Sequence, residues 1–382
     1  MSAARTGGSW LFGLTLLVTL SFAAFTESGC SSSSKTSTST SATTGSSQFL
    51  YVSSNSANTT SAWAINSDAS LTAVSGSPFP GGGFSVAADP KAQFLFTVGG
   101  TSLANPTLDT ETIAANGSLV VASSISDNTL TGPISVNPSG STLYVSSISA
   151  VQGNPGWKIY SIQSDGSLQF ASAVISQVAG RLAFSADGSF AYSTSCYHLT
   201  QSIELFATAN NALTGTSDPV PQVGSFGECP NAVAVSASGS MAAVPWSDAD
   251  NVGPVDNLIA IYTIDSSTHA LTPISGSPFP ASGAGVDIAF DPSGKFVVVA
   301  QDNGIGVYQV GQSSVTEVSG SPFISGTNIS RVQFSPNGAF VAAASNSAGQ
   351  LYAFSFNSST GALTAGPGSP VAVASPDDLT IH

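Results

Sequence analysis

One pattern recurs from residue 48 onward: an apolar segment, a tight turn and a second apolar segment. In one copy, Val286 to Val299, the turn is Asp291–Gly294, with the sequence Asp-Pro-Ser-Gly. Pro fixes the φ angle at the start of such a turn, and Gly or Asn takes the left-handed position. Equivalent turns lie at intervals of 44 to 55 residues, at Asp89–Pro90, Asn137–Gly140, Ser185–Gly188, Ser236–Gly239 and Ser335–Gly338. A repeat of this length is typical of β-propeller blades.

Each period has room for four strands. In the copy above we expect them at Asp287–Phe290, Phe296–Ala300, Ile305–Val310 and Val315–Val318, the last two joined by a hairpin turn. A Gly-Ser-Pro-Phe phrase follows the fourth strand in several periods, at Ser75–Phe79, Ser275–Phe279 and Ser319–Phe323. Its Pro suits an exposed outer edge strand.

The two ends of the repeat region complement each other. Asp378–Ile381 matches the inner strand Asp287–Phe290, and Gln48–Val52 matches the strand that follows the turn. We therefore predict an all-β fold: a seven-bladed β-propeller with four antiparallel strands per blade, closed by N- and C-terminal strands that share one blade. The alternative, an open β-solenoid, would not need complementary ends.

Composition narrows the functions that are possible. The chain has 382 residues, of which 42% are hydrophobic and only 7% charged, and its formal net charge is −14 with seven basic residues. This balance argues against binding to nucleic acid or to an anionic membrane surface through charge.

The N-terminus has the features of an export signal. Arg5 is the only charge before an apolar stretch from Trp10 to Phe25, and Cys30 follows small residues. Cys30 directly after Gly29 resembles a bacterial lipobox, in which the Cys is acylated, although Glu27 stands where lipoboxes prefer Leu. Cleavage after Ala23 or Ala24 by an ordinary signal peptidase is the alternative.

The segment after Cys30 favours the lipoprotein. Ser31 to Ser47 is almost entirely Ser and Thr, which cannot bury a core and suits a flexible tether. We predict a signal peptide at 1–29, a Ser/Thr-rich tether at 30–47 and the propeller at 48–382. The chain would then be exported to the cell envelope, in the periplasm or on the outer surface.

The turns of the Asp-Pro-Ser-Gly-Lys-Phe type and the Gly-Ser-Pro-Phe phrases resemble those of the seven-bladed lactonase-like propellers, a family that includes bacterial 6-phosphogluconolactonase and relatives of fungal muconate cycloisomerase. The resemblance covers roughly residues 48–382 and implies lactone hydrolysis. Active members often carry Pro-Arg-His at the start of an inner strand and a Glu at the end of the next strand. Here Leu182 follows Arg181 in place of the His, and the next strand ends at Thr194–Cys196 without the Glu.

Aligning the expected inner strands on their first residue gives one ring of seven positions: Asp378, Ser85, Pro133, Arg181, Ala232, Asp287 and Arg331. Inner strands line the central channel of a propeller, so the ring should lie at one channel mouth. The two arginines that follow residue 47 both belong to it. We expect Asp287, Arg331 and Asp378 on three consecutive blades, with Arg181 across the channel from Arg331.

This ring permits two interpretations. As a binding site, Arg181 and Arg331 would hold a small acidic or sugar-derived ligand, because the guanidinium fork matches carboxylate and phosphate groups. Asp287 or Asp378 would then be the candidate general base that activates water. As a structural element, the four side chains would form an ion-pair network in a narrow, wet channel.

Cys196 and Cys229 are expected on adjacent blades at the face that carries the ring. In an exported domain this pair predicts a disulfide. The alternatives are two free thiols or a metal site, but His198 is the only nearby His and leaves a zinc shell incomplete.

Other chemistry has little support in the sequence. No phosphate-cradling loop, nucleophile elbow or metalloprotease motif is present, and we expect no cofactor and no metal. His198 is either a surface residue or a catalyst. Four acids in the loops of the same face would make a calcium site in one alternative, but their spacing fits no EF-hand: Asp248, Asp250, Asp256 and Asp302.

Three functions therefore remain: a binding or interaction module at the cell envelope, a lactone hydrolase at the channel mouth, and a structural surface-layer component. The absent His and Glu favour the binding module over the hydrolase. We expect a monomer without a nucleic-acid partner, in contact with the membrane only through its N-terminal lipid.

Replacing Cys30 tests the anchor. We predict that radiolabelled palmitate is incorporated into the wild type and lost in Cys30→Ala, because acyl chains would be attached at that residue. Ser31→Ala is the control and should keep the label. Labelling that survives in Cys30→Ala, or no labelling of the wild type, would contradict the lipoprotein prediction.

Overall fold

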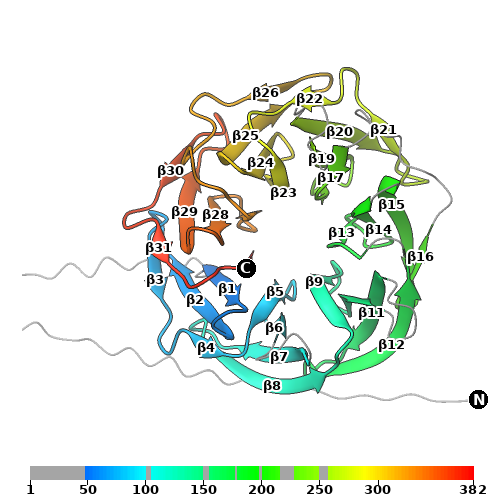
Figure 1. Ribbon diagram of the computed structural model, residues 1–382, viewed down its shortest axis with the longest axis vertical. Helices are drawn as coiled ribbons and strands as arrows, with labels where there is room; N and C mark the ends of the chain where they lie inside the picture. Colours follow the sequence, from blue (N-terminus) through cyan, green and yellow to red (C-terminus); the bar gives the residue numbers. More distant parts are fainter. Residues whose placement is uncertain are drawn as a thin grey trace, which may run out of the picture. The chain divides into compact units, whose positions relative to one another are not determined.

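The computed structural model describes residues 48–99, 105–148, 155–176, 179–197, 200–215, 228–248 and 257–382, without the side chains of 195–202, 228 and 248. All regular structure in these ranges is β, and the strands form seven antiparallel sheets around a common centre (Figure 1). The predicted seven-bladed propeller is confirmed. The predicted signal peptide and tether lie outside the described residues.

We number the sheets as blades in chain order. Blade 1 contains β1 (Gln48–Ser54), β2 (Thr59–Ile65), β3 (Leu71–Ala73), β4 (Phe79–Pro80) and β32 (Asp378–Ile381). Blade 2 contains β5 (Gly83–Ala88), β6 (Phe94–Gly99), β7 (Thr107–Ile113) and β8 (Leu119–Ser126). Blade 3 contains β9 (Leu130–Val136), β10 (Thr142–Ile148), β11 (Pro155–Ile162) and β12 (Leu168–Ile175). Blade 4 contains β13 (Ala183–Phe184), β14 (Phe190–Tyr197), β15 (Thr200–Ala209) and β16 (Ala212–Gly215).

The remaining blades follow the same order. Blade 5 contains β17 (Glu228–Pro230), β18 (Ala234–Val235), β19 (Met241–Asp248), β20 (Leu258–Ile264), β21 (Leu271–Pro273) and β22 (Phe279–Pro280). Blade 6 contains β23 (Gly285–Phe290), β24 (Phe296–Gln301), β25 (Gly304–Val310) and β26 (Val315–Glu317). Blade 7 contains β27 (Arg331–Phe334), β28 (Phe340–Ser345), β29 (Gln350–Phe356), β30 (Leu363–Ala365) and β31 (Val371–Ala372).

The repeated turn has the backbone that its sequence predicts. It joins the innermost strand of a blade to the second strand, and Gly294 takes a left-handed φ of 72° in blade 6. The Gly294 N–H donates to the Asp291 carbonyl at 2.9 Å, which closes the turn. In blade 2 Ala92 takes the same place with a φ of 56°, so this turn tolerates a side chain there at some cost in backbone strain.

The two ends of the repeat close the ring, as predicted. β32 pairs antiparallel with β1, with Leu50 opposite Ile381 and Ser53 opposite Asp378. β32 is thus the inner strand of a blade whose other strands come from the start of the repeat region (Figure 1).

The Gly-Ser-Pro-Phe phrase continues the outer edge of the blade after a short interruption. In blade 1 β3 pairs with Trp63–Ile65 of β2, and Phe79 pairs with Thr60 further along the same strand. β22 and β31 pair with the third strand in the same way in blades 5 and 7. The outer edge of these blades is therefore made of two short segments, which limits the free edge open to another chain.

The core lies mainly between neighbouring blades. Leu50 and Val52 of blade 1, for example, pack with Ala342 and Ala344 of blade 7. One position on the third strand is occupied in the same register in all blades, by Trp63, Glu111, Tyr160, Phe206, Tyr262, Tyr308 and Phe354. Six of these residues are aromatic, which fills the space between wedge-shaped blades, and Glu111 of blade 2 is the exception.

Within the described ranges we find no helix with the length and hydropathy needed to cross a bilayer.

Removing residues 378–382 should unfold the ring. The deletion removes β32, with Leu379 and Ile381 each at most 4% exposed, and leaves one edge of β1 unpaired. We expect a loss of about 5 kcal/mol or more in the free energy of unfolding, measured by urea titration. A five-residue deletion at 36–40, in the Ser/Thr-rich segment, serves as the control. Equal unfolding curves for the two deletions would contradict this account of closure.

Candidate functional site

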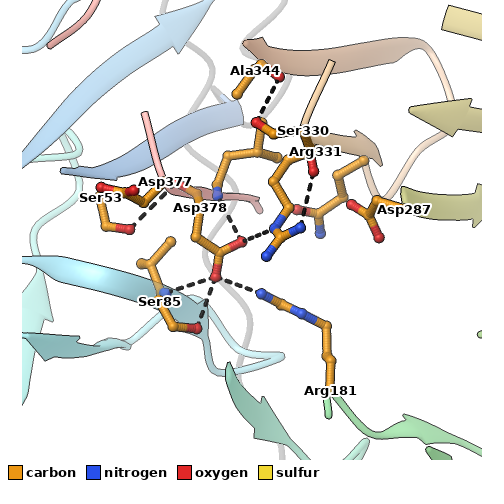
Figure 2. Close-up of polar contacts among 12 residues, drawn as sticks. Ser53, Ser85, Arg181, Asp287, Ser330, Arg331, Ala344, Asp377 and Asp378 are labelled. Atoms are coloured by element: carbon orange, nitrogen blue, oxygen red, sulfur yellow. Dashed lines mark hydrogen bonds and ion pairs between the residues drawn. The ribbon is translucent and has the colours of Figure 1, made fainter. Parts of the chain in front are cut away.

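The polar ring predicted at the channel mouth brings four side chains together. Asp378 begins β32, Arg331 begins β27, Asp287 lies near the start of β23, and Arg181 precedes β13. Figure 2 shows the guanidinium groups of both arginines at the Asp378 carboxylate, each at a different oxygen, with Asp287 beyond Arg331. The sequence prediction that these residues share one mouth is therefore correct in its geometry.

Asp378 is the buried centre of this group, with 1% of its surface exposed. Its Oδ2 accepts hydrogen bonds from the Ser85 hydroxyl at 2.8 Å and from the Val86 N–H at 3.0 Å, both on β5 of the next blade. Its Oδ1 accepts one from the Leu379 N–H at 3.0 Å. The carboxylate is thus bonded to the backbone of its own blade and of blade 2.

Both arginines form ion pairs with that carboxylate. Arg181 Nη2 lies 2.5 Å from Asp378 Oδ2, and Arg331 Nε lies 3.3 Å from Oδ1. Arg331 Nε is close enough to Asp378 Oδ1 for an ion pair, but its N–H group does not form a hydrogen bond. The Arg331 Nη1 group donates to the Ser330 carbonyl at 2.9 Å. The two guanidinium side chains remain 41% and 31% exposed, so each keeps part of its surface for solvent or a ligand.

Opposing effects set the pKa of Asp378. Burial alone would raise it, but the positive charges of Arg181 and Arg331, together with the bonds from Val86 and Ser85, outweigh burial and lower the pKa below its usual value. Asp378 is therefore an ionised structural group, and its oxygens are already occupied, so it is poorly suited to accept a proton from water.

Asp287 differs from Asp378 although both occupy the same position of the repeat. Its Oδ2 accepts a bond from the Val332 N–H at 3.1 Å and its Oδ1 one from the Ile288 N–H at 3.0 Å. No ion pair within 4 Å joins it to another described residue. Desolvation raises its pKa, and the more distant charges of Arg331 and Arg181 only partly oppose this. Of the two acids, Asp287 is the one that could exchange a proton.

The ring residues also connect neighbouring inner strands. Asp287 bonds blade 6 to blade 7, and Asp378 bonds blade 1 to blade 2. Ser85 continues the pattern by accepting from the Ile134 N–H of blade 3 at 3.0 Å. Pro133 cannot do so, and Ser135, two residues further, accepts from the Leu182 N–H of blade 4 at 2.9 Å. These bonds explain the acids and serines structurally, whereas they do not account for the two arginines.

Two cavities adjoin the ion-pair cluster. One, of about 260 Å³, is lined by residues that include Gly180, Thr194 and Asn231. The other, of about 170 Å³, is lined by residues that include Gln333 and Thr380. Both are lined by Arg181, Asp287, Ile288 and Arg331. Three of the four predicted polar residues, Arg181, Asp287 and Arg331, thus line both cavities, whereas Asp378 lines only the second.

The structure adds one residue to the site that the alignment of the seven inner strands did not identify. Asn231 directly precedes the ring position Ala232, and its Nδ2 donates to the Ser247 hydroxyl at 2.6 Å and to the Gly285 carbonyl at 2.8 Å. It joins blade 5 to blade 6 and lines the larger cavity. Its offset by one residue from the aligned position hid it from the alignment.

Several other predictions are not tested. His198 and the side chain of Cys196 lie outside the described residues, as do Asp250, Asp256 and the side chain of Asp248. Cys229 is described and is 2% exposed, and its disulfide with Cys196 stays a prediction. Among the described residues, no group of three or more His, Cys, Asp or Glu side chains is arranged to hold a metal ion.

Comparison with known proteins agrees with this fold. The family model described as lactonase, 7-bladed beta-propeller matches residues 255–377. A candidate 6-phosphogluconolactonase from Bacteroides uniformis is similar over 88% of this chain and 100% of its own, with 15% identity and a TM-score of 0.71. The periplasmic gluconolactonase of Pseudomonas aeruginosa is similar over 88% and 99%, with 18% identity and a TM-score of 0.65. No curated protein sequence matches the chain.

The fold and the ring define a seven-bladed β-propeller with a polar channel mouth. More particularly, the chain is similar to the lactonase-like propellers, by sequence in residues 255–377 and by fold over most of its length. The resemblance inferred from the repeat phrases is thereby confirmed. The same architecture extends to hydrazine synthase from Kuenenia stuttgartiensis, at 15% identity and a TM-score of 0.55, so the fold alone does not fix an activity.

Substituting the two ring acids should separate their roles. We expect Asp378→Asn to lower the free energy of unfolding at pH 7 by about 2 kcal/mol or more, because it leaves two arginines beside a neutral group. Asp287→Asn should cost less, because Asp287 forms no ion pair within 4 Å with a described residue and its hydrogen-bond donors are two backbone N–H groups. Urea unfolding measures both variants, and an equal cost would contradict the distinction.

The pH dependence provides a second check. The folded pKa of Asp378 lies below its unfolded value, so its contribution is complete above the unfolded pKa of about 3.9 and is lost as the pH falls through the folded pKa. The stability difference between wild type and Asp378→Asn should therefore narrow below about pH 4. A difference that stays constant down to pH 2 would show that the charge of Asp378 is not what stabilises the ring.

Proposed function

We propose that this chain is a binding propeller of the lactonase-like type, which holds a small anionic ligand of the sugar-acid class at its channel mouth. The observation that carries the proposal is the pair Arg181 and Arg331. Both guanidinium groups are oriented by one buried carboxylate, both stay partly exposed, and both line the same two cavities. One arginine would be enough to balance the charge of Asp378, so a purely structural role does not explain why there are two.

Charge supports an anionic ligand. Both arginines form ion pairs with Asp378 alone, and no ion pair within 4 Å joins either of them to Asp287. A carboxylate or phosphate group would restore the balance and accept the remaining guanidinium N–H donors. The cavities of about 260 and 170 Å³ suit a small molecule, since pockets for larger, drug-sized ligands start at about 300 Å³.

Polar groups around the larger cavity suit a polyhydroxylated ligand. Thr194 and Asn231 lie along its wall together with the backbone of Gly180. A hydroxyl and an amide placed beside two guanidinium groups provide donors and acceptors for a sugar chain that carries one acidic end.

Lactone hydrolysis at the same mouth is the second candidate. Asp287 supports it, because this carboxyl lines both cavities and burial has raised its pKa, which moves a carboxyl toward the range of a general base at neutral pH. The names of the similar structures include gluconolactonases. Binding without hydrolysis is preferred because Leu182 replaces the family His and the occupied oxygens of Asp378 cannot activate water.

The proposed location is the cell envelope. Residues 1–29 would direct export, Cys30 would carry the lipid, and residues 31–47 would separate the propeller from the membrane. The sequence of this segment is the support for the location.

Calorimetric titration with gluconate and 6-phosphogluconate tests the proposal. We expect saturable binding to the wild type and at least about tenfold weaker binding to Arg331→Ala, because one charge-assisted contact is lost. Lys295→Ala removes the same charge from a turn at the other end of the inner strand, and should bind as the wild type does. Equal affinity of Arg331→Ala and wild type, or no binding to either, would refute a ligand site at these arginines.

A lactone-hydrolysis assay on the same proteins distinguishes the two candidates. Turnover that Asp287→Asn abolishes while gluconate binding persists would establish the second candidate. Absence of turnover in a wild type that binds gluconate would establish the first.

A further inference from the structure

A second polar cluster lies away from the channel mouth, at the junction of blades 1 and 2. Asp109 and Glu111 are two residues apart on β7 and therefore point to the same face of the sheet. Asp109 is 8% exposed and Glu111 is 0% exposed. Neither carboxylate oxygen of Glu111 has a hydrogen-bond partner. The junction thus buries two acids, one of which has no hydrogen bond to its carboxylate.

No basic group in the part of the chain that the structure describes forms an ion pair with these acids. The segment 100–106, which leads into β7, contains no Lys, Arg or His. An uncompensated buried carboxylate is strongly unfavourable, so Glu111 needs either a proton or a cation from solution.

The repeat shows that Glu111 is not there for packing. The equivalent position in the other six blades holds Trp, Tyr or Phe, and Glu111 alone replaces that aromatic ring with a carboxyl. Asp109, the preceding residue on the same face of β7, is also an acid. Burial raises the pKa of Glu111 to about 8, and the charge of Asp109 contributes to the shift.

More oxygen atoms surround the two carboxyls. Thr97 on β6 is directly opposite Asp109 in the strand pairing, is 1% exposed, and its hydroxyl has no partner. Thr107 Oγ1 donates to Asp109 Oδ2 at 3.2 Å. From the side of blade 1, the Thr60 hydroxyl donates a hydrogen bond to the Gly81 carbonyl at 3.3 Å. Thr97 and Thr107 thus provide hydroxyl oxygens beside Asp109, and the segment that enters blade 2 provides a carbonyl oxygen at Gly81.

Gly81, in the segment between β4 and β5, lies directly beside these oxygens. A methyl group built on Gly81 would lie 3.2 Å from Glu111 Oε1 and 3.6 Å from Asp109 Oδ2, so both carboxyls converge on this residue. Gly81 has a φ of 87°, a conformation that favours glycine. Glycine at position 81 therefore lets the backbone pass close to both carboxyls.

We propose that Asp109 and Glu111 bind a divalent cation, with Ca²⁺ as the preferred ion, at the junction of blades 1 and 2. Two carboxylates match the charge of a divalent ion, and the Thr97 hydroxyl and Gly81 carbonyl are oxygens of the kind that complete its shell. Ca²⁺ accepts six to eight oxygen ligands in irregular geometry at about 2.3–2.6 Å, whereas Mg²⁺ demands a near-ideal octahedron. The ion would tie β7 to the segment that enters blade 2 from blade 1 (Figure 1).

Thermal unfolding of the full chain tests the site, first stripped with EDTA and then supplied with millimolar CaCl₂ or MgCl₂. We expect Ca²⁺ to raise the Tm of the wild type by at least about 3 °C, because an ion that binds only the folded state stabilises it by mass action. Equilibrium dialysis with ⁴⁵Ca²⁺ should find one bound ion, and Mg²⁺ should compete only weakly. Glu111→Gln keeps the shape of the side chain and should lose both the shift and the bound ion.

Two further variants complete the design. Asp165→Asn removes an exposed hairpin acid and should respond to Ca²⁺ as the wild type does. Asp109→Asn provides a second test if Glu111→Gln does not fold, because Asp109 is less completely buried than Glu111. This variant should weaken Ca²⁺ binding at least about tenfold.

Other results would overturn the proposal. One is a wild type that neither binds Ca²⁺ nor gains stability from it, but becomes more stable as the pH falls below 8, which would mean that a proton neutralises Glu111. Another is a Ca²⁺-dependent shift that persists in both Glu111→Gln and Asp109→Asn, which would place the ion elsewhere.

Discussion

The carboxylate of Asp378 is the contact on which the ring and its mouth both depend. It belongs to the strand that completes blade 1, accepts hydrogen bonds from Ser85 and Val86 of blade 2, and pairs with Arg181 and Arg331 of blades 4 and 7. A single buried group therefore joins four of the seven blades. Because its contacts with water are replaced by charged and backbone donors, burial does not neutralise it. The arginines that face the cavities are held in place by the same group that closes the fold.

Equivalent positions in the repeat have taken on different chemical roles. Asp378 is ionised, and its oxygens take part in hydrogen bonds and ion pairs with two arginines. Asp287 accepts hydrogen bonds from only two backbone N–H groups, and its pKa is raised. Both still hold the next inner strand, so the structural task is shared and the difference lies in the partners that reach them across the channel. This divergence is how a repeat with one strand pattern can present a site that is not symmetric.

The sequence was sufficient for the fold because the signals that define it are local. The turn residues and the match between Asp378–Ile381 and other inner strands depend only on neighbours along the chain. The phase of the inner strands also brought Asp287, Arg331, Asp378 and Arg181 to one mouth correctly. The sequence could not show which of the two acids forms ion pairs with the arginines, because that depends on how the Arg181 side chain extends across the channel from blade 4. The cluster around Glu111 could not be predicted, because the equivalence of Glu111 to the aromatic residues of the other blades depends on the strand register.

The order of the strands along the chain gives the closure another consequence. β32 follows every other strand, yet it fills the innermost place of the first blade. While a chain is being synthesised, β1 therefore keeps one edge unpaired, and the apolar side chains meant to lie beneath β32 remain accessible. Unpaired edges and exposed apolar surface are the features that chaperones and proteases act on. Only a chain that has been synthesised through β32 can therefore cover the inner edge of β1 and the apolar side chains beneath it.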